Sequence, residues 1–236
     1  MLLTLKKLTT ISFFILVSFL LSCRSGNLET TVNYVDSSKI SHIKSVLILG
    51  NSIVKQGPEP NIGWYGNWGM AASIMDSDFV HILMKGISAK DSSVVIRYRN
   101  IADFEFDFVR FSFAELDSLR NPDMLILKIS ENVDDQMAVD SNFSKYYDQL
   151  VRYIDSNQNS LNVIVDGFWD KPHVNGIIRQ YAIQNKLPFI SITDLSADPD
   201  NEAGKAYPDS GVGMHPSDQG MRKIADRIWN YIKVYF

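Results

Sequence analysis

The sequence predicts an α/β protein, a three-layer α/β/α sandwich built on about five parallel strands. Five short apolar runs, rich in branched residues, are typical of strands that are buried on both faces. Helical patterns separate the later runs. Strand, helix and strand follow one another over about 30 residues, which predicts parallel pairing with right-handed crossovers. The expected strands are residues 45–49, 94–98, 124–129, 161–165 and 188–192.

Local signals support each element. The first expected strand reads Ser-Val-Leu-Ile-Leu and stops at Gly50. Residues 201–213 are rich in glycine and proline, which indicates a loop. Residues 104–113 alternate imperfectly, so this segment is either an additional strand or a covering loop. Apolar residues recur at the three-to-four spacing of a helix face in residues 143–154, 174–181 and 221–232.

Composition excludes several classes of protein. The 236 residues include 23 Lys and Arg against 27 Asp and Glu, and 45% are hydrophobic, which is typical of a globular chain of one domain. The net charge of −4 argues against nucleic acid as the main partner, because phosphate binding needs a surplus of Lys and Arg. One cysteine excludes a disulfide framework, and His42, His81 and His173 lack the spacing of metal ligands. We expect no metal and no cofactor, and the oligomeric state stays open.

The first residues have the features of a signal peptide. Two lysines precede an apolar run at residues 11–21, which is too short for a comfortable membrane span of about 20 apolar residues. The run ends in Leu20-Leu21-Ser22-Cys23, which resembles the lipobox of bacterial lipoproteins. The resemblance implies that Cys23 is lipidated and anchors the protein in the bacterial cell envelope, facing the periplasm or the cell surface.

These signals divide the chain into three parts. Residues 1–22 are the expected signal peptide, residues 23–43 a lipidated cysteine with a mostly polar tether, and residues 44–236 the folded domain. Two alternatives remain for the first part: a cleaved signal peptide followed by an incidental cysteine, or an uncleaved anchor.

Three polar residues lie where a parallel sheet binds ligands, beyond the carboxyl ends of its strands. Ser52 follows the first strand, where a helix would offer free N–H groups, so it is either a nucleophile or a helix cap. Asn132 follows the third strand and either donates its amide into the same cleft or occupies a turn. His215 opens the last helix and is either a general base or a packing residue.

Four short motifs carry these residues, and their order along residues 44–236 resembles that of the SGNH (GDSL-type) hydrolases. The resemblance implies a flavodoxin-like α/β/α sandwich, in agreement with the strand and helix pattern. The motifs are Gly50-Asn51-Ser52, Asn67-Trp68-Gly69-Met70-Ala71-Ala72, Ser130-Glu131-Asn132 and His215-Pro216.

The resemblance also implies a role for each motif. Ser52 matches the nucleophile and His215 the general base. Gly69, through its backbone N–H, and Asn132, through its amide, match the oxyanion hole, with the Ser52 N–H as third donor. The chain is thus expected to be a serine esterase that forms an acyl-enzyme on Ser52, because such a set of groups serves acyl transfer.

Three positions depart from the motifs of that family. Asn51 stands where aspartate is more frequent, and Ser130 replaces a glycine. Val212 occupies the position of the usual acid, three residues before His215. Two alternatives follow for the histidine: Asp209 orients the ring as the third member of a triad, or a backbone carbonyl fixes the tautomer of a dyad.

Aromatic residues bear on the substrate. Trp64, Trp68 and Trp169 are expected near the cleft, where they either pack against sugars or acyl chains or belong to the core. A lipid-anchored hydrolase of this type suggests an esterase that removes O-acetyl groups from a carbohydrate. The alternatives are a lipase- or lysophospholipase-like esterase, and a catalytically impaired carbohydrate-binding module.

Overall fold

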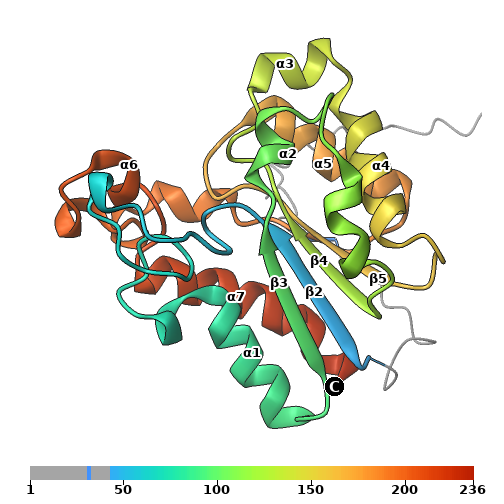
Figure 1. The fold of residues 1–236 in the computed structure, drawn as a ribbon, viewed down its shortest axis with the longest axis horizontal. Coiled ribbons are helices and arrows are strands. Elements are labelled where there is room, and N and C mark those ends of the chain that lie inside the picture. Colours follow the sequence, from blue (N-terminus) through green and yellow to red (C-terminus); the bar gives the residue numbers. More distant parts are fainter. Residues whose placement is uncertain (1–30, 33–42) are drawn as a thin grey trace, which may run out of the picture.

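A computed structural model describes residues 31–32 and 43–236 of the chain (Figure 1). A single sheet has the strand order β1-β6-β5-β4-β2-β3, in which every pair from β6 to β3 is parallel and β1 is antiparallel to β6. The five parallel strands of the prediction are therefore confirmed. Their bounds are β2 (Ser45–Gly50), β3 (Val95–Asn100), β4 (Met124–Lys128), β5 (Leu161–Val165) and β6 (Phe189–Ile190), with β1 at Thr31–Val32.

Helices cover both faces of the sheet, which gives the three expected layers (Figure 1). The layer on one face contains α1 (Phe79–Lys90) and α7 (Asp218–Ile232). The layer on the other face contains α2 (Ala102–Phe106), α3 (Asp135–Asp140), α4 (Phe143–Ile154) and α5 (Pro172–Gln184). The other helices of the described residues are α6 (Ser210–Gly213) and the 3-10 turns Pro60–Ile62, Met75–Ser77, Phe113–Leu119, Thr193–Ala197, Pro199–Asn201, Gly204–Ala206 and Lys233–Tyr235.

The central strands are continuous apolar runs because both of their faces are buried. In β2, Val46 and Ile48 face the core under α1 and α7, whereas Leu47 and Leu49 face the core under α4 and α5. All four side chains are fully buried. Successive residues of a strand point to opposite faces, so this run fixes β2 at the centre of the sheet.

Residues 104–113 resolve the open alternative. They contain the end of α2, a covering loop and the first residue of a 3-10 turn, so the additional strand is excluded. Phe104 and Phe108 are buried there and pack against Phe143 of α4, with ring centroids 6.2 and 5.0 Å away. The predicted loop at residues 201–213 includes the short helix α6 and a 3-10 turn.

A side lobe, made of residues 56–76 and 199–216, lies beside the carboxyl ends of the strands (Figure 1). It has a small apolar core of its own that includes Trp64, Met70, Ala71 and Val212. The lobe brings a segment that follows β2 together with the segment that precedes α7, and it thereby carries His215 toward the loop after β2.

The expected signal peptide at residues 1–22, Cys23 and most of the expected tether lie outside the described residues. Within the tether, Thr31 and Val32 pair with Ile190 and Phe189 of β6. In the described part of the chain, no helix has both the length and the apolar character needed to cross a bilayer.

Candidate active site

The turn after β2 places Ser52 at the edge of the sheet where the parallel strands end. Gly50 pairs with Asn100 of β3 and with Lys128 of β4, so the loops that follow these strands meet. A Cβ at Gly50 would lie 2.4 Å from Val54 and 2.5 Å from the Lys128 carbonyl, so only glycine fits this approach. The Asn51 carbonyl then accepts hydrogen bonds from the N–H groups of residues 54 and 55, which closes the turn.

Ser52 and His215 form a hydrogen-bonded pair. The distance from Ser52 Oγ to His215 Nε2 is 2.8 Å, and that from His215 Nδ1 to the carbonyl oxygen of Gly211 is 2.7 Å. A carbonyl oxygen only accepts, so Nδ1 carries the proton and Nε2 of the neutral ring accepts from the Ser52 hydroxyl. Burial lowers the pKa of His215, which favours this neutral form. The ring is therefore set up as a general base.

The structure decides between the two alternatives for orienting His215. The Asp209 carboxylate accepts the Val212 N–H at 3.0 Å and caps α6, while the Gly211 carbonyl of the same helix accepts from the ring. Asp209 is thus not the hydrogen-bond partner of His215, and the carbonyl-oriented dyad is the arrangement observed. Val212 is buried in the apolar core of the side lobe, a site where a carboxylate would lose its hydration.

The expected oxyanion donors differ in their availability. Asn132 Nδ2 donates one hydrogen to Glu105 Oε2 at 2.6 Å and has a second hydrogen to offer. The Ser52 backbone N–H has no hydrogen-bond acceptor among the described residues. The Gly69 N–H, by contrast, donates to Asp78 Oδ2 at 3.0 Å, so in this structure it is not free for an oxyanion.

Gly69 nevertheless packs closely against the turn that carries Ser52. A Cβ at this position would lie 2.6 Å from the carbonyl oxygen of Ile53, and the next N–H, that of Met70, donates to the Ser52 carbonyl at 2.8 Å. Asp78, which holds the Gly69 N–H, is fully buried and also lies 2.8 Å from His81 Nδ1. Gly69 therefore serves here for close approach of two backbone segments.

Two buried carboxylates lie beneath these groups. Asn51 Nδ2 donates to Glu105 Oε1 at 3.1 Å and to Glu131 Oε2 at 2.6 Å, and Lys128 forms an ion pair with Glu131. Burial, together with the nearby Glu131, raises the pKa of Glu105 to about 7. Burial is the largest single effect on Glu131 and works to raise its pKa, but the Lys128 charge and the hydrogen bonds from Lys128, the Phe168 N–H and Asn51 together hold that pKa below its ordinary value.

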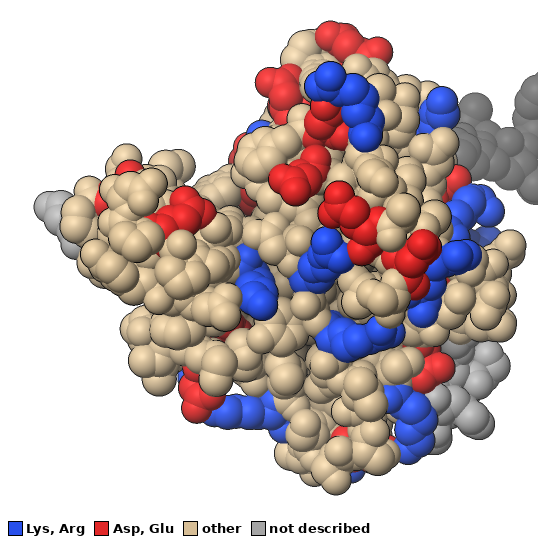
Figure 2. All heavy atoms as spheres, viewed as in Figure 1, with Lys and Arg blue, Asp and Glu red and all other residues tan. Residues whose placement is uncertain are grey.

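A pocket of about 400 Å³ opens beside Ser52 and Asn132. In Figure 2 the surface is hollowed between the side lobe and the body of the molecule. The lining is mostly polar and carries two carboxylates, with Phe106 as its one large apolar side chain, 64% exposed. The lining residues are Ser52, Gln56, Glu59, Asn100, Ala102, Asp103, Phe106 and Asn132.

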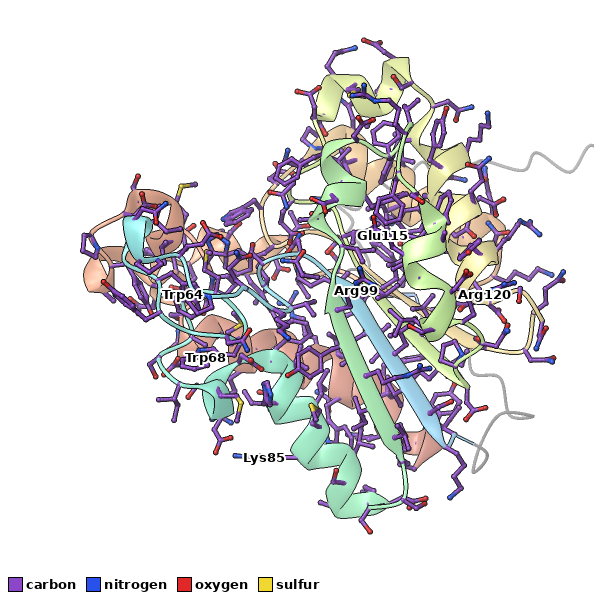
Figure 3. The ribbon with its side chains drawn as sticks, in the orientation of Figure 1. Trp64, Trp68, Lys85, Arg99, Glu115 and Arg120 are labelled. Carbon is purple, nitrogen blue, oxygen red and sulfur yellow. The ribbon has the colours of Figure 1, made fainter. Side chains whose placement is uncertain are left out.

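The three expected tryptophans differ in position. Trp64 is only 2% exposed and packs edge-on against Trp68, with centroids 5.7 Å apart, so both belong to the core of the side lobe (Figure 3). The expectation that Trp64 packs against a substrate is therefore wrong. Trp169 is half-buried, and its ring lies 5.3 Å from that of His215 at an angle of 89°. Of the three tryptophans, Trp169 is the one that borders the Ser52–His215 pair.

Sequence reasoning identified Ser52 and Asn132 but missed the other polar residues of the pocket and the buried pair Glu105 and Glu131. The only local signal for Glu105 is its place between Phe104 and Phe106, and it is weak because Asp103 and Asp107 flank the same phenylalanines. Across residues 31–32 and 43–236, no group of three or more His, Cys, Asp or Glu side chains is arranged to hold a metal ion.

Comparisons with known proteins show that the fold of this chain is similar to that of several solved structures. No model of a protein family matches the sequence, and no curated protein matches it significantly. Among solved structures, the chain is similar to a two-domain esterase active on acetylated mannans, with a TM-score of 0.56 and 21% identity over 81% of this chain. The match covers 49% of that esterase, so this chain spans about half of its length.

Two further structures are similar over nearly their whole length. The psychrotrophic esterase EstA from Pseudoalteromonas sp. has a TM-score of 0.52 and 13% identity, over 80% of this chain and 97% of its own. The acetyl xylan esterase AlAXEase has a TM-score of 0.50 and 17% identity, over 79% of this chain and 98% of its own. At these identities the comparisons establish the α/β fold, which agrees with the fold expected from the motifs.

Proposed function

We propose that this protein is a serine esterase that removes acyl groups, acetyl groups above all, from a carbohydrate. The observation that supports it most directly is the 2.8 Å contact between Ser52 Oγ and His215 Nε2, with the opposite ring nitrogen held by the Gly211 carbonyl. This pair has the tautomer and the geometry that a general base and its nucleophile need.

The mechanism follows from these groups. The Ser52 hydroxyl attacks the ester carbonyl while His215 Nε2 takes its proton, and the negative oxygen is stabilised by the free N–H of the Asn132 amide and the Ser52 backbone N–H. His215 then gives the proton to the leaving alcohol, which leaves an acyl group on Ser52. A water molecule gives a proton to His215 and attacks this acyl-enzyme; the bond to Ser52 Oγ then breaks, His215 returns the proton to Ser52, and the acid is released.

The pocket favours a hydroxylated substrate over a lipid. An acyl chain lying there would remove water from the Glu59 and Asp103 carboxylates without replacing their hydrogen bonds, which is costly. Sugar hydroxyls can donate to these carboxylates, and the exposed ring of Phe106 can pack against the apolar face of a sugar. The similar structures include esterases described as active on acetylated mannans and as an acetyl xylan esterase. We therefore favour the carbohydrate esterase over the lipase-like alternative.

The location of the protein is a second part of the proposal. Residues 1–22 act as a signal peptide, and Cys23 carries a lipid that holds the domain at the bacterial cell envelope, on its periplasmic or outer side. Radiolabelled fatty acid incorporated into the wild-type chain, and lost in Cys23→Ala, is the result expected.

The test uses the full chain purified in detergent. Wild-type protein should hydrolyse 4-nitrophenyl acetate much faster than the octanoate and should release acetate from acetylated mannan or xylan. Ser52→Ala should lower kcat by about 10³-fold or more, whereas Ser92→Ala, an exposed residue in the turn before β3, should not change it. Binding of the glycan without Ser52-dependent turnover would instead identify a binding module, and preference for the octanoate would identify a lipase-like enzyme.

A further inference from the structure

Glu105 joins two of the segments that form the candidate active site. It lies in α2 and is 1% exposed. Its carboxylate accepts three hydrogen bonds: from the Ser130 N–H at 2.5 Å, from Asn132 Nδ2 at 2.6 Å and from Asn51 Nδ2 at 3.1 Å. Asn51 directly precedes Ser52, so one buried side chain contacts both the turn that bears the nucleophile and the loop that bears the amide donor.

These contacts fix the rotation of the Asn132 carboxamide. One hydrogen of Nδ2 is held by Glu105 Oε2, so the second hydrogen has a single direction. If the amide flipped, its oxygen would face the carboxylate, and two acceptors would meet without a proton between them. Because Asn132 lines the pocket with Ser52, the direction of its free N–H in that pocket is set before any substrate binds.

We propose that Glu105 is a positioning residue for the reaction, which orients the Asn132 amide and holds it in register with Ser52. The proposal rests on the esterase function proposed above. Glu105 does not touch the substrate, and its effect on catalysis passes through Asn132.

Ionisation of Glu105 should also affect the pH dependence of kcat. The charged groups that face it are Glu131, which raises its pKa, and Lys128, which lowers it; burial has the largest effect, and the pKa is raised to about 7. His215 also senses Glu131 and Lys128, and burial places its pKa below 6.5. Protonation of Glu105 turns one acceptor oxygen into a donor, so kcat should fall partly near pH 7 and then completely at lower pH, when His215 is protonated.

The experiment is a double-mutant cycle on the full chain in detergent, with kcat and KM for 4-nitrophenyl acetate. Glu105→Gln keeps the shape of the side chain but replaces one acceptor oxygen by a donor. We expect it to lower kcat by about 10- to 100-fold with little change in KM, and Asn132→Ala to lower kcat by about 10²-fold or more. In the Asn132→Ala background, Glu105→Gln should cost less than about 3-fold.

Glu115→Gln is the matched control, since Glu115 lies ten residues further along the chain, in the 3-10 turn Phe113–Leu119, and is exposed beside Arg99 (Figure 3). It should keep wild-type kinetics, and Glu105→Gln should lose the partial step near pH 7. Additive effects of Glu105→Gln and Asn132→Ala, or unchanged kcat in Glu105→Gln, would overturn the inference while esterase activity stands. Absence of Ser52-dependent turnover in the wild type would overturn the proposed function as well.

Thermal unfolding of each variant separates catalysis from folding. If Glu105→Gln does not fold, the pH dependence of kcat in the wild type and the kinetics of Glu105→Asp test the role of Glu105. A single acid step below pH 6.5 in the wild type, with full kcat in Glu105→Asp, contradicts the proposal. Two steps, with lowered kcat in Glu105→Asp at unchanged KM, support it.

Discussion

Asn51 illustrates how one side chain can be explained by its neighbours. Its amide donates to both Glu105 and Glu131, so it needs two hydrogens and no charge. The family that the motifs resemble more often has aspartate at this place. An aspartate here would add a third buried carboxylate to a cluster in which Lys128 provides the positive charge. The buried acids therefore account for the departure at this position.

The first prediction concerns this position. Asn51→Asp should lower the free energy of unfolding by about 2–4 kcal/mol, because it removes two hydrogen bonds and buries an unpaired charge. The loss should be larger at pH 8 than at pH 5.5, since the acids are then more fully ionised. Urea unfolding at both pH values measures it. Asn230→Asp, on the exposed side of α7, is the control and should stay within about 0.5 kcal/mol of wild type. A stability equal to that of the control would exclude this explanation.

At the scale of elements, α6 is the helix that orients the His215 ring. Its four residues, Ser210–Gly213, present the Gly211 carbonyl to His215, and the Asp209 carboxylate accepts the Val212 N–H as an N-cap. A helix this short depends strongly on its cap, because most of its backbone N–H groups lack partners within the helix. Asp209 can thus affect catalysis without touching the imidazole.

The second prediction separates capping by Asp209 from its charge. Asp209→Asn keeps a good N-cap, whereas Asp209→Ala removes it. We expect kcat for 4-nitrophenyl acetate to fall by about 10-fold in the alanine variant and less than about 2-fold in the asparagine variant. If Asp209 oriented His215 through its charge, both variants would lose activity equally. Equal losses would therefore restore the triad alternative, and KM should hardly change in any case.

The sequence predicted the central elements well. The run that became β2 is apolar throughout because both faces are buried, and the face of α4 repeats at helical spacing because one side meets the sheet. Residues 104–113 could not be assigned, because Phe104 and Phe108 pack from a short helix and a loop, and neither has a regular period. The short helix α6 was not predicted, because a four-residue helix that contains two glycines looks like a loop in the sequence.

Site residues could be predicted where the signal lies in neighbouring sequence, and not where it depends on contacts with distant residues. Ser52 and His215 were candidates from their places after a strand and before a helix, and the resemblance of the four motifs paired them although 163 residues separate them. The role of Glu105 depends on partners 54, 27 and 25 residues away, so nothing near it in the sequence indicates the contacts. Trp64 was misjudged because an aromatic residue in a loop looks the same whether a side lobe buries it or not.

At the scale of the whole molecule, folding buries an acidic residue, Asp166, at the end of β5. Asp166 follows β5 and is 3% exposed; its carboxylate accepts the Ser191 hydroxyl at 2.6 Å and the Ile192 N–H at 2.7 Å. These bonds tie the end of β5 to the chain after β6. Burial outweighs them and raises the pKa of Asp166 to about 6. Between the ordinary pKa of 3.8 and this raised value, the Asp166 carboxyl is therefore protonated in the folded protein and ionised in the unfolded chain.

The third prediction follows from this difference. Between the unfolded pKa of 3.8 and the folded value of about 6, the native state holds more protons than the unfolded state, so its stability falls as the pH rises. The contribution of Asp166 is fully present below about pH 4 and should drop by up to about 3 kcal/mol by pH 7. Asp166→Asn does not titrate, so the free energy of unfolding of wild type minus that of the variant should decrease from pH 4.5 through about pH 6 and level off by pH 7.5 in urea titrations. Asp226→Asn, on the exposed face of α7, should give a flat difference. A difference that rises with pH for Asp166→Asn would mean that the hydrogen bonds from residues 191 and 192 outweigh burial, and that the carboxylate is ionised throughout.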